Sequence, residues 1–548
     1  MGAAQYSADK GPVCPASSLR PSPAADLLLT ILVVVAAAGT AAALRDAAVF
    51  FAATTVFIIG SLLLEGLADI YRRLESRIAE PSEVLKIVIG PWFGLILVGA
   101  VSLSLPLATE SGVPDYRHNF WLHVLNSAHA AVSSSCLVGT TVYDFGREYT
   151  MFGQAVLILI TQFAGMAFAA VGLAIVRPFL QNAIRLRTVL YFSFALQAAG
   201  ILVMWRSWQT ADAPACEDRL WWGLVHSSSA IWNNGLVLRP NGFFPYVRSG
   251  PIFAAITTLA IVGSLGLPMI LDLVLGLRTS KGVARPPSSG RPDSAESPPP
   301  WQWLPSWDTA FAFLLLLVGA CLLFTFEAPW KPEAAWSLPE SWVPQRPIEF
   351  GGGRASLRDD LPHSTRWTLA VFVSSTLRSA GLQSVSVSEG AMSWPSYGVF
   401  LLWMFVGGSA GGVAGGLRTT VLSTLAIGQL SRKRTWSAHP DGLAIRRTLT
   451  RSAIRIPILC LLLNAGAVAT LNWCTDAGKY EVAFDAVAAC SGVGLSTGAT
   501  LHLTWLGRVV IIVIMIVGRL APVVCWLGVS RRITACLQRR EGRDSGCP

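Results

Sequence analysis

The stretch Ala488-Ala-Cys-Ser-Gly-Val-Gly494-Leu495 is the last of four related stretches in this chain. In each one, a small residue lies six positions before a glycine, and the segment is too short and too mildly apolar to cross a membrane. Four copies of one unit in a single chain indicate an internal repeat. The three earlier stretches are Ser133-Ser-Ser-Cys-Leu-Val-Gly139-Thr140, Ser229-Ala-Ile-Trp-Asn-Asn-Gly235-Leu236 and Ser375-Thr-Leu-Arg-Ser-Ala-Gly381-Leu382.

The composition places these stretches in a membrane protein. Of the 548 residues, 53% are hydrophobic and 14% are charged, whereas about a quarter of the residues in a soluble protein are charged. This balance excludes soluble, disordered and collagen-like chains, and the ten cysteines are too dispersed for a small disulfide-rich protein. The net charge of +10 is typical of basic cytoplasmic loops in a membrane protein. We therefore expect the lipid bilayer, and no nucleic acid, as a partner.

Ten apolar runs are long enough to cross a bilayer, which needs about 20 residues per helix. The first run could belong to a cleaved signal peptide, but it is longer than the usual core of about 7–15 residues, so we count it as a helix. The runs cover residues 25–44, 47–67, 84–107, 151–176, 188–205, 251–275, 309–326, 397–428, 454–471 and 506–529.

Charged residues alternate between the connections of these runs. Lys and Arg follow every even-numbered run, for example Arg432, Lys433 and Arg434 after the eighth, while Glu110 and Asp476 lie in opposite connections. Because cytoplasmic loops carry the excess of Lys and Arg, both termini are predicted to be cytoplasmic. The chain is thus expected to be a multi-pass protein of the cell inner membrane.

Together, the repeats and runs predict an all-α polytopic membrane protein. Two leading helices precede four span–pore-loop–span repeats, which surround one central pore. A Pro- and Ser-rich stretch reads as a cytoplasmic linker between the second and third repeats. The predicted parts are a cytoplasmic tail (1–24), the leading helices and their loop (25–83), repeat 1 (84–177), repeat 2 (178–279), the linker (280–302), repeat 3 (303–434), repeat 4 (435–530) and a basic cytoplasmic tail (531–548).

A re-entrant pore loop explains the repeated unit. Irregular backbone is tolerated at membrane depth only where protein or water surrounds it, so four such loops should converge on one axis. A short helix that enters from outside directs its partly negative C-terminal end inward, and glycine then allows carbonyl oxygens to face the axis. Rings of carbonyls can replace the water shell of a monovalent cation. The alternative is an ordinary loop with a turn glycine, which four corresponding copies make less probable.

Several motifs resemble the Trk/Ktr/HKT superfamily of potassium transporters. The fourth stretch, followed by Met515-Ile-Val-Gly-Arg519-Leu-Ala-Pro522, is similar to the last repeat of that family. Arg378-Ser-Ala-Gly-Leu-Gln-Ser-Val385 is similar to its R-T-A-G-F-N-T-V signature, and Asn233-Asn-Gly235 to its N-A-G-F. Phe405-Val-Gly-Gly-Ser-Ala-Gly-Gly-Val-Ala-Gly-Gly-Leu-Arg-Thr-Thr420 resembles G-G-S-P-G-S-T-A-G-G-I-K-T. The resemblance covers all four repeats, and the two leading helices match an extra pair in the bacterial Trk branch.

The resemblance implies a selectivity filter and a gate. Six glycines in ten residues would by themselves weaken a helix, at about 1 kcal/mol each, although close packing between helices is an alternative role. The filter residues it implies are Val138, Gly139, Asn234, Gly235, Ala380, Gly381, Val493 and Gly494. The gate residues it implies are Gly407, Gly408, Gly411, Gly412, Gly415, Gly416 and Arg519.

Four charged residues near these sites also receive predictions. A cation in the middle of a span, such as Arg519, costs at least about 2.5–3.5 kcal/mol unless it faces water or a partner. The resemblance implies that Arg519 faces the pore and holds the gate by hydrogen bonds to the carbonyl groups of the gate segment. The alternative is a salt bridge between helices. Arg378 is expected to make a structural pairing behind the filter. Glu481 and Asp485 are expected in the first turns of the fourth pore helix, where carboxylates favour the positive end; attraction of cations at the external mouth is the alternative.

Other chemistry finds little support in the sequence. His129 and His226 fall on pore helices, where polar packing explains them, and no metalloprotease, paired Cys or nucleotide-binding motif is present. Cys216 and Cys474 could pair or stay free. We therefore expect no enzyme activity, no bound organic cofactor and no metal other than the transported ion.

The predicted function is potassium uptake, driven by the membrane potential. The resemblance further implies a homodimer and a cytosolic nucleotide-binding regulatory subunit. A sodium- or proton-coupled symporter is an alternative. So is a non-conducting scaffold, because Cys136-Leu-Val138 in the first filter stretch lacks the Asn or Thr common in the family.

Overall fold

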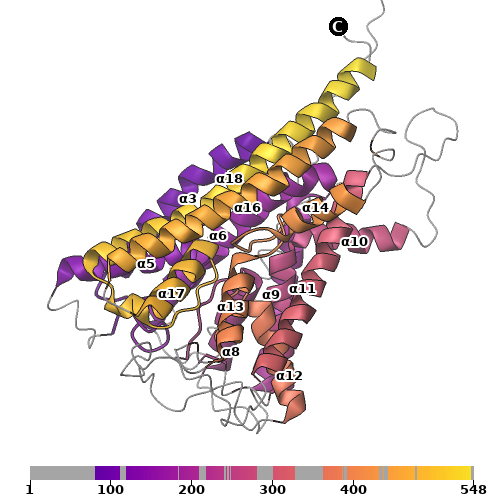
Figure 1. Ribbon diagram of the computed structural model, residues 1–548. Helices are drawn as coiled ribbons and strands as arrows, with labels where there is room; N and C mark the ends of the chain where they lie inside the picture. Colours follow the sequence, from indigo (N-terminus) through magenta and orange to yellow (C-terminus); the bar gives the residue numbers. More distant parts are fainter. Residues whose placement is uncertain are drawn as a thin grey trace, which may run out of the picture. The chain divides into compact units, whose positions relative to one another are not determined.

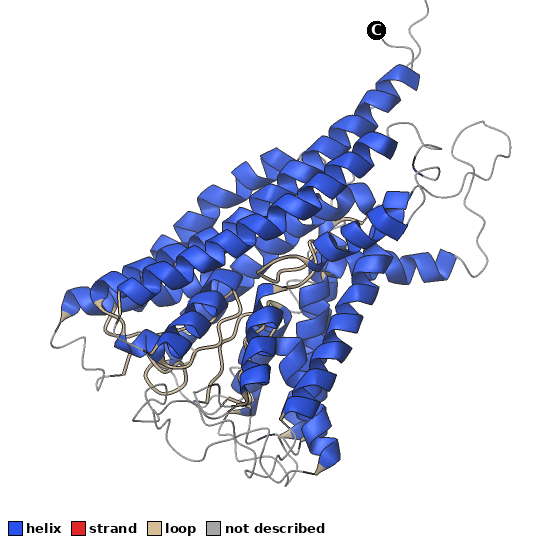
Figure 2. Ribbon diagram, in the orientation of Figure 1, coloured by secondary structure: helices blue, strands red, loops and turns tan. Residues whose placement is uncertain are grey.

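The computed structural model describes residues 81–544 with several gaps. The gaps fall within 111–118, 183, 209–217, 240–248, 280–299, 328–361, 386–391, 431–441 and 476–477. The predicted N-terminal tail, the first two predicted spans, most of the linker, Cys216 and residues 545–548 of the predicted C-terminal tail therefore lie outside the described residues. Figure 2 shows that the described part consists of helices and loops, without strands, which confirms the predicted all-α class.

Four short helices lie between longer ones, and we call them the pore helices. At 13–16 residues each, they measure about 20–24 Å, less than the roughly 30 Å of a bilayer core. Two of them begin at a polar N-cap: the Asn119 side chain accepts a hydrogen bond from Leu122 N–H, and Asp218 from Trp221 N–H. The pore helices are α5 (Phe120–Ser135), α8 (Arg219–Ile231), α12 (His363–Thr376) and α17 (Lys479–Ser491).

A long helix precedes each pore helix and another helix or helix pair follows it. Six helices are long and apolar enough to cross a membrane, and a bent pair would make a seventh, among the residues described. The preceding helices are α3 (Pro81–Leu103), α7 (Leu186–Ser207), α11 (Leu304–Phe326) and α16 (Gly442–Trp473). The following ones are α6 (Met151–Val176), the pair α9 (Gly250–Leu265) and α10 (Leu267–Thr279), the pair α13 (Trp394–Phe405) and α14 (Thr419–Leu430), and α18 (Trp505–Asp544). Short 3-10 helices occur at Arg177–Phe179 (η1), Pro300–Trp303 (η3) and Ala499–His502 (η6).

Packing between these helices follows a cyclic order. Each preceding helix packs on its own pore helix, in the pairs α3 and α5, α7 and α8, α11 and α12, and α16 and α17. Each following helix also packs on the pore helix of the next unit, in the pairs α6 and α8, α9 and α12, α13 and α17, and finally α18 and α5. The last contact returns to the first unit, so the described helices pack in a closed cyclic order. Figure 1 shows the long helices α3, α16 and α18 running along one side of the molecule.

Four of the predicted spans differ from the helices observed. The apolar runs 454–471 and 506–529 belong to the longer helices α16 and α18, of 32 and 40 residues. Arginines end an apolar run but favour helix, so both helices continue beyond the run. The run 251–275 is not one straight span, because α9 and α10 meet at 90°. The run 397–428 is interrupted between α13 and α14 by the Gly-rich segment, residues 407–416 with their flanks.

Gly266 is the residue that bends the sixth span. Its φ of +90° lies in the region open to glycine, and a Cβ atom there would lie 2.5 Å from the nitrogen of Gly412. Pro268 follows at once, which favours a new helix start. The bend therefore results from a backbone that lets another segment approach closely.

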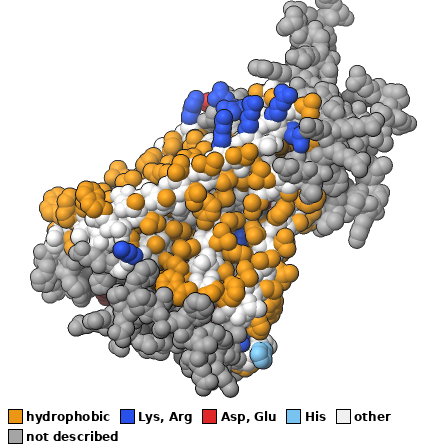
Figure 3. All heavy atoms as spheres, viewed as in Figure 1, with side chains coloured by type: hydrophobic (Ala, Val, Ile, Leu, Met, Phe, Trp, Pro, Cys, Tyr) orange, Lys and Arg blue, Asp and Glu red, His pale blue; other side chains and the backbone are white. Residues whose placement is uncertain are grey.

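Side chains on the visible surface separate by type. Figure 3 shows a broad hydrophobic face with Lys and Arg gathered along one edge of it. Three helices, α3, α16 and α18, carry exposed basic side chains near the N-terminal ends of α3 and α16 and in the C-terminal part of α18. These side chains are Lys86, Arg447, Arg451, Arg455, Arg531 and Arg532. A broad apolar surface with one basic edge is typical of a membrane protein.

Substitution of Gly266 tests the bend. Gly266→Ala should destabilise the protein by at least about 1–2 kcal/mol, because alanine is strained at positive φ and its Cβ would overlap Gly411 and Gly412. Thermal unfolding in detergent would measure the loss. Gly250→Ala is the matched control, since no atom lies within 4 Å of a Cβ at that position on the same helix. Equal stability of the two variants would contradict the steric role of Gly266.

Candidate ion pathway

Each pore helix ends in one of the four glycine turns, which are the four stretches quoted first. In three of them, the N–H of the residue before the glycine donates to the carbonyl five residues earlier. These bonds are Val138 to Ser133 at 2.9 Å, Asn234 to Ser229 at 2.8 Å and Val493 to Ala488 at 2.9 Å. In the third unit, Gly381 itself donates to Thr376 at 3.0 Å. In the other three units, the residue that accepts this bond is the small residue noted in the sequence.

Left-handed backbone turns the chain after these bonds. Gly139 and Gly494 have φ values of +91° and +84°, and Gly381 has +57°. Leu137 and Asn233 also have positive φ, of 55° and 52°, although neither is glycine. Such a conformation is uncommon for a residue with a side chain and occurs where the surrounding structure enforces it.

The four glycines lie next to each other in a ring. A Cβ atom at Gly139 would overlap the backbone of Gly235, and one at Gly235 would lie 3.1 Å from the carbonyl oxygen of Gly381. A Cβ at Gly381 would overlap the Val493 carbonyl, and one at Gly494 would overlap the Val138 carbonyl. Units 1, 2, 3 and 4 thus touch in order and the last touches the first. The structure therefore brings all the sequence-predicted filter positions together.

Hydrogen bonds within the ring use some of these carbonyls. The Val138 carbonyl accepts from Gly235 N–H at 3.3 Å, and the Asn234 carbonyl accepts from Leu236 N–H at 2.7 Å. Around the ring, Gly139 N–H donates to the Ser133 hydroxyl at 3.0 Å, and the Asn234 amide donates to the Thr161 hydroxyl. The turns are thus fixed by backbone and hydroxyl groups that are buried within the protein.

Asp485 organises the chain that follows the fourth turn. Glu481 lies in the first turn of α17, as expected, whereas the buried Asp485 lies about one turn further along. Its carboxylate accepts hydrogen bonds from Thr497 N–H and hydroxyl at 2.8 and 3.0 Å and from the Ser496 hydroxyl at 2.8 Å. A bond from Thr500 N–H at 3.3 Å completes the set. Asp485 therefore holds residues 496–500 against the pore helix, a role that its spacing along the sequence did not reveal.

The Gly-rich segment packs against three neighbours. A Cβ atom at Gly415 would overlap the carbonyl of Ser491, next to the fourth glycine turn. At Gly172 on α6, a Cβ would lie 2.7 Å from the Gly411 oxygen, and the bend at Gly266 meets the same residue. Close backbone packing, the alternative role of these glycines, is thus present, and it places the segment directly beside the ring.

Three buried arginines bind carbonyl groups of the Gly-rich segment and its neighbourhood. Arg519 donates to the Val413 carbonyl, and its guanidinium lies 4.2 Å from the centre of the Phe168 ring. Arg418 donates to the carbonyls of Ser409 and Gly412 at 2.9 and 3.0 Å. Arg519 forms no ion pair with any residue that the structure describes, so the salt-bridge alternative finds no support there.

Arg378 connects the third glycine turn to two other elements. Its guanidinium donates to the Ala312 carbonyl on α11 at 3.0 Å and to the Gly407 carbonyl at 3.1 Å. The side chain is buried, with 3% of its surface exposed. Arg378 thus has a structural role behind the ring, through carbonyl groups.

The sequence analysis missed Asp308, the buried carboxylate nearest the Gly-rich segment. One of its oxygens, Oδ2, accepts hydrogen bonds from the hydroxyls of Ser409 at 2.6 Å and Thr420 at 2.8 Å. Its position directly before an apolar run is compatible with an exposed helix end, so its burial could not be read from the run.

The two histidines of the pore helices are buried. His226 Nδ1 lies 2.8 Å from the Trp222 carbonyl, and its Nε2 accepts from Leu238 N–H at 3.4 Å, which is polar packing as predicted. His129 is fully buried, and its ring nitrogens have no hydrogen-bond partner in the described part of the chain. Groups of three or more His, Cys, Asp or Glu that could hold a metal are also absent there. Cys474 is a free, buried cysteine.

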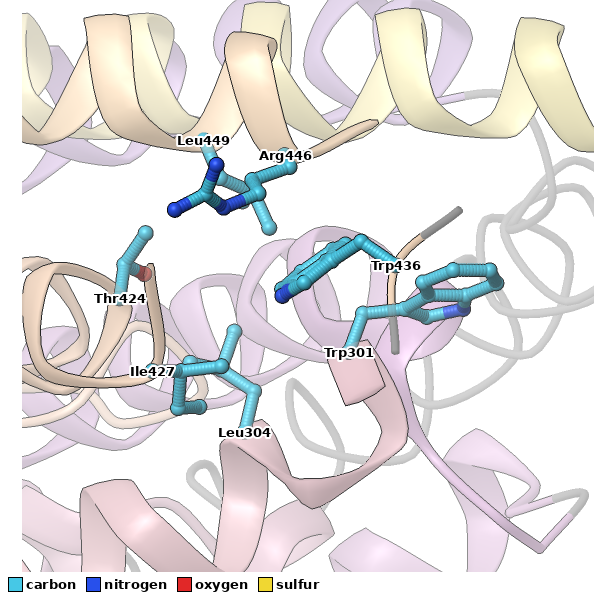
Figure 4. Close-up of a pocket in the computed structure, with 7 residues that line it drawn as sticks. All are labelled: Trp301, Leu304, Thr424, Ile427, Trp436, Arg446 and Leu449. Carbon is cyan, nitrogen blue, oxygen red and sulfur yellow. The ribbon is translucent and has the colours of Figure 1, made fainter. Parts of the chain in front are cut away.

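A small pocket lies beside α14, the helix that follows the Gly-rich segment. Figure 4 shows the rings of Trp301 and Trp436 and the side chain of Arg446 around it. Its lining also includes Leu304, Thr424, Ile427 and Leu449. We assign no ligand to it.

Long apolar helices with short helices between them, arranged in a ring, define a class of polytopic membrane transport proteins. The model of the TrkH family, described as a cation transport protein, matches residues 174–527, and the chain belongs to this family. This confirms the resemblance drawn from the motifs. As a member of a transporter family, the protein is not an enzyme.

Several known proteins are similar to this chain over most of its length. The Ktr system potassium uptake protein B of Vibrio alginolyticus is 23% identical over 80% of this chain and 89% of its own. The protein of the same name from Bacillus subtilis is 24% identical over 81% and 91%. The potassium/sodium uptake protein NtpJ of Enterococcus hirae is 22% identical over 81% and 92%. The crystal structure of the potassium transporter TrkH from Vibrio parahaemolyticus shares the fold, with a TM-score of 0.53, 16% identity and 94% and 97% coverage.

Asp485 offers a test of how the chain after the fourth turn is held. Asp485→Ala should speed hydrogen exchange of residues 496–500 and lower thermal stability, because each lost hydrogen bond to a charged group costs about 1.5–3 kcal/mol. Exchange followed by mass spectrometry would measure the effect. Glu481→Ala, one turn earlier on the same helix, is the control and should leave exchange there unchanged. Unaltered exchange in Asp485→Ala would refute the role.

Proposed function

We propose that this chain forms a pathway for potassium uptake through the ring of glycine turns. The observation that carries the proposal is the cyclic contact of Gly139, Gly235, Gly381 and Gly494, each at the end of a pore helix. Support also comes from relatives whose names describe potassium uptake. In this proposal, Val138, Asn234, Ala380 and Val493 contribute the neighbouring carbonyl groups of a selectivity filter.

Electrostatics supports a cation at the ring. Each pore helix ends at a glycine turn, so four partly negative helix ends lie close to the same point. Carbonyl oxygens can replace the hydration shell of a monovalent cation without any buried acidic side chain. The inside-negative membrane potential would then drive uptake, at about 2.3 kcal/mol per charge for each 100 mV. No covalent chemistry is needed.

The Gly-rich segment is proposed as the gate of this pathway. It packs beside the fourth glycine turn, where Gly415 approaches Ser491, and movement there would alter access to the ring. Its glycines, Gly407, Gly408, Gly411, Gly412, Gly415 and Gly416, lower the cost of a change in backbone conformation. Arg519 would hold the segment and also repel cations below the filter.

Topology and partners follow from the charge pattern. The basic edge formed by α3, α16 and α18 would face the cytoplasm of a cell whose inner membrane the protein crosses, with both termini inside. That edge is a suitable contact for a cytosolic nucleotide-binding regulatory subunit. A homodimer with one pathway per subunit is the proposed assembly, by analogy with the family.

Coupled symport is a second candidate, because one relative is named a potassium/sodium uptake protein. A channel-like pathway predicts rubidium uptake that is independent of sodium and proton gradients. A symporter predicts a reversal potential that shifts with the second ion. A non-conducting scaffold predicts no flux. Expression in a bacterium without its own potassium uptake, followed by growth on low potassium and a rubidium flux assay, separates the three.

A substitution in the ring tests the filter. Gly494→Asp should abolish rubidium flux, because any side chain there would overlap the Val138 carbonyl. Gly494→Ala should lower flux at least about tenfold, since strain at positive φ alone costs about 1–2 kcal/mol. Gly466→Ala is the control, because no atom lies within 4 Å of a Cβ at that exposed position on α16. Wild-type flux in Gly494→Asp would disprove the filter.

Removal of the Arg519 charge tests the barrier below the filter. Arg519→Ala should raise the rate of rubidium uptake several-fold, because it removes a cation from the pathway and releases the Val413 carbonyl. Whole-cell flux, normalised to the amount of protein in the membrane, would measure the change. The control is Gly528→Ala at an exposed position of the same helix, where no atom lies within 4 Å of a Cβ, and it should keep the wild-type rate. An unchanged or lower rate in Arg519→Ala would contradict the proposed barrier.

A further inference from the structure

Asp308 is a fully buried carboxylate in the second turn of α11, and the site described above assigns it no role. Both hydrogen bonds that its Oδ2 accepts come from hydroxyl groups, those of Ser409 and Thr420. Its other oxygen, Oδ1, has no hydrogen-bond partner within the described chain. A buried carboxylate is costly to leave without partners, so its surroundings deserve an explanation.

The two hydroxyl donors come from opposite ends of the Gly-rich segment. Ser409 lies near its beginning, whereas Thr420 lies in the first turn of α14, just after its end. The Thr420 hydroxyl also accepts a hydrogen bond from Ala410 N–H at 2.8 Å. One carboxylate oxygen on α11 therefore joins both ends of the loop and fixes them to a neighbouring helix.

Two buried arginines bind the same segment. Arg418, which follows the glycines directly, donates to the carbonyls of Ser409 and Gly412, and Arg378, in the third glycine turn, donates to the Gly407 carbonyl. Two buried positive charges on the segment that Asp308 contacts make this position unfavourable for a bound cation. The geometry thus favours a structural tie over an ion-binding site.

We propose that Asp308 is a positioning residue that latches the Gly-rich segment in the conformation seen here. Movement of the segment away from α11 requires the bonds from both Ser409 and Thr420 to Asp308 to break. Asp308 thereby sets the balance between the latched and released states of the gate. The inference rests on the proposed function, because it assigns regulation to that same pathway.

Variants of the three residues test the latch. Ser409→Ala and Thr420→Val each remove one hydroxyl and keep the buried charge, and Asp308→Asn keeps an acceptor oxygen but removes the charge. Each should raise rubidium leak into proteoliposomes without a regulatory subunit by about tenfold, the effect of one hydrogen bond to a charged group. Ser423→Ala is the matched control, because this buried hydroxyl donates only to backbone carbonyls of Thr419 and Thr420. It should leave the leak unchanged.

Hydrogen exchange gives a readout that does not depend on transport. Amides of residues 407–416 should exchange about tenfold faster in the latch variants, while those of the glycine turns should not change. The double variant of Asp308→Asn and Ser409→Ala should exchange no faster than the more affected single variant, because the two groups form one bond. If Asp308→Asn fails to fold, the two hydroxyl variants still measure the latch.

The outcomes separate this inference from the proposed function. Absence of rubidium flux in every protein, including the wild type, would refute the transport proposal, while exchange would still test the latch. A conducting wild type with unchanged leak and exchange in Ser409→Ala and Thr420→Val would overturn the latch. Loss of sodium-dependent uptake in Asp308→Asn, without faster exchange, would overturn it in favour of an ion-binding carboxylate.

Discussion

The absence of a side chain at the four ring glycines is the constraint on which the structure depends. At three of them a Cβ atom would overlap the backbone of the next turn, and at Gly235 it would lie 3.1 Å from a carbonyl oxygen. The turns of units 1, 3 and 4 can therefore meet their neighbours only with glycine there, and Gly235 gives the second unit the closest fit. Because irregular backbone inside a membrane must be surrounded by protein or water, this meeting point also makes the half-length pore helices possible. The cyclic packing of the helices follows from it.

A second feature, the Gly-rich segment, depends on buried charges. Its backbone lacks the regular bonds of a helix, so its carbonyls need other donors. Arg519, Arg418 and Arg378 supply them from three different parts of the chain, and Asp308 accepts from its hydroxyls. This arrangement explains how several charged side chains can lie within an apolar protein. Each of them forms hydrogen bonds with polar groups of a segment that would otherwise be buried without partners.

Much of the fold could be predicted because its signals are local. Apolar runs of about 20 residues mark spans, and the glycines of the turns and of the Gly-rich segment mark breaks, without knowledge of any contact. The predictions were wrong or incomplete where the structure depends on contacts between distant residues. The run 251–275 is uniformly apolar, yet it bends by 90° because Gly412 lies against Gly266. Likewise, Asp485 lies on α17 as expected, but its partners are residues 496–500 beyond the turn.

The amino-acid sequence alone predicted the class of protein, most of the spans that the structure describes, the repeated glycine turns and the place of Arg519 on the last span. These properties depend on periodicity, composition and residue type, which are read along the chain. Three-dimensional packing alone established that unit 4 closes on unit 1, that Arg378 reaches Gly407, and that Asp308 joins Ser409 to Thr420. Such pairs are far apart in the chain, and a hydrogen bond between distant residues leaves no pattern in the sequence of either one.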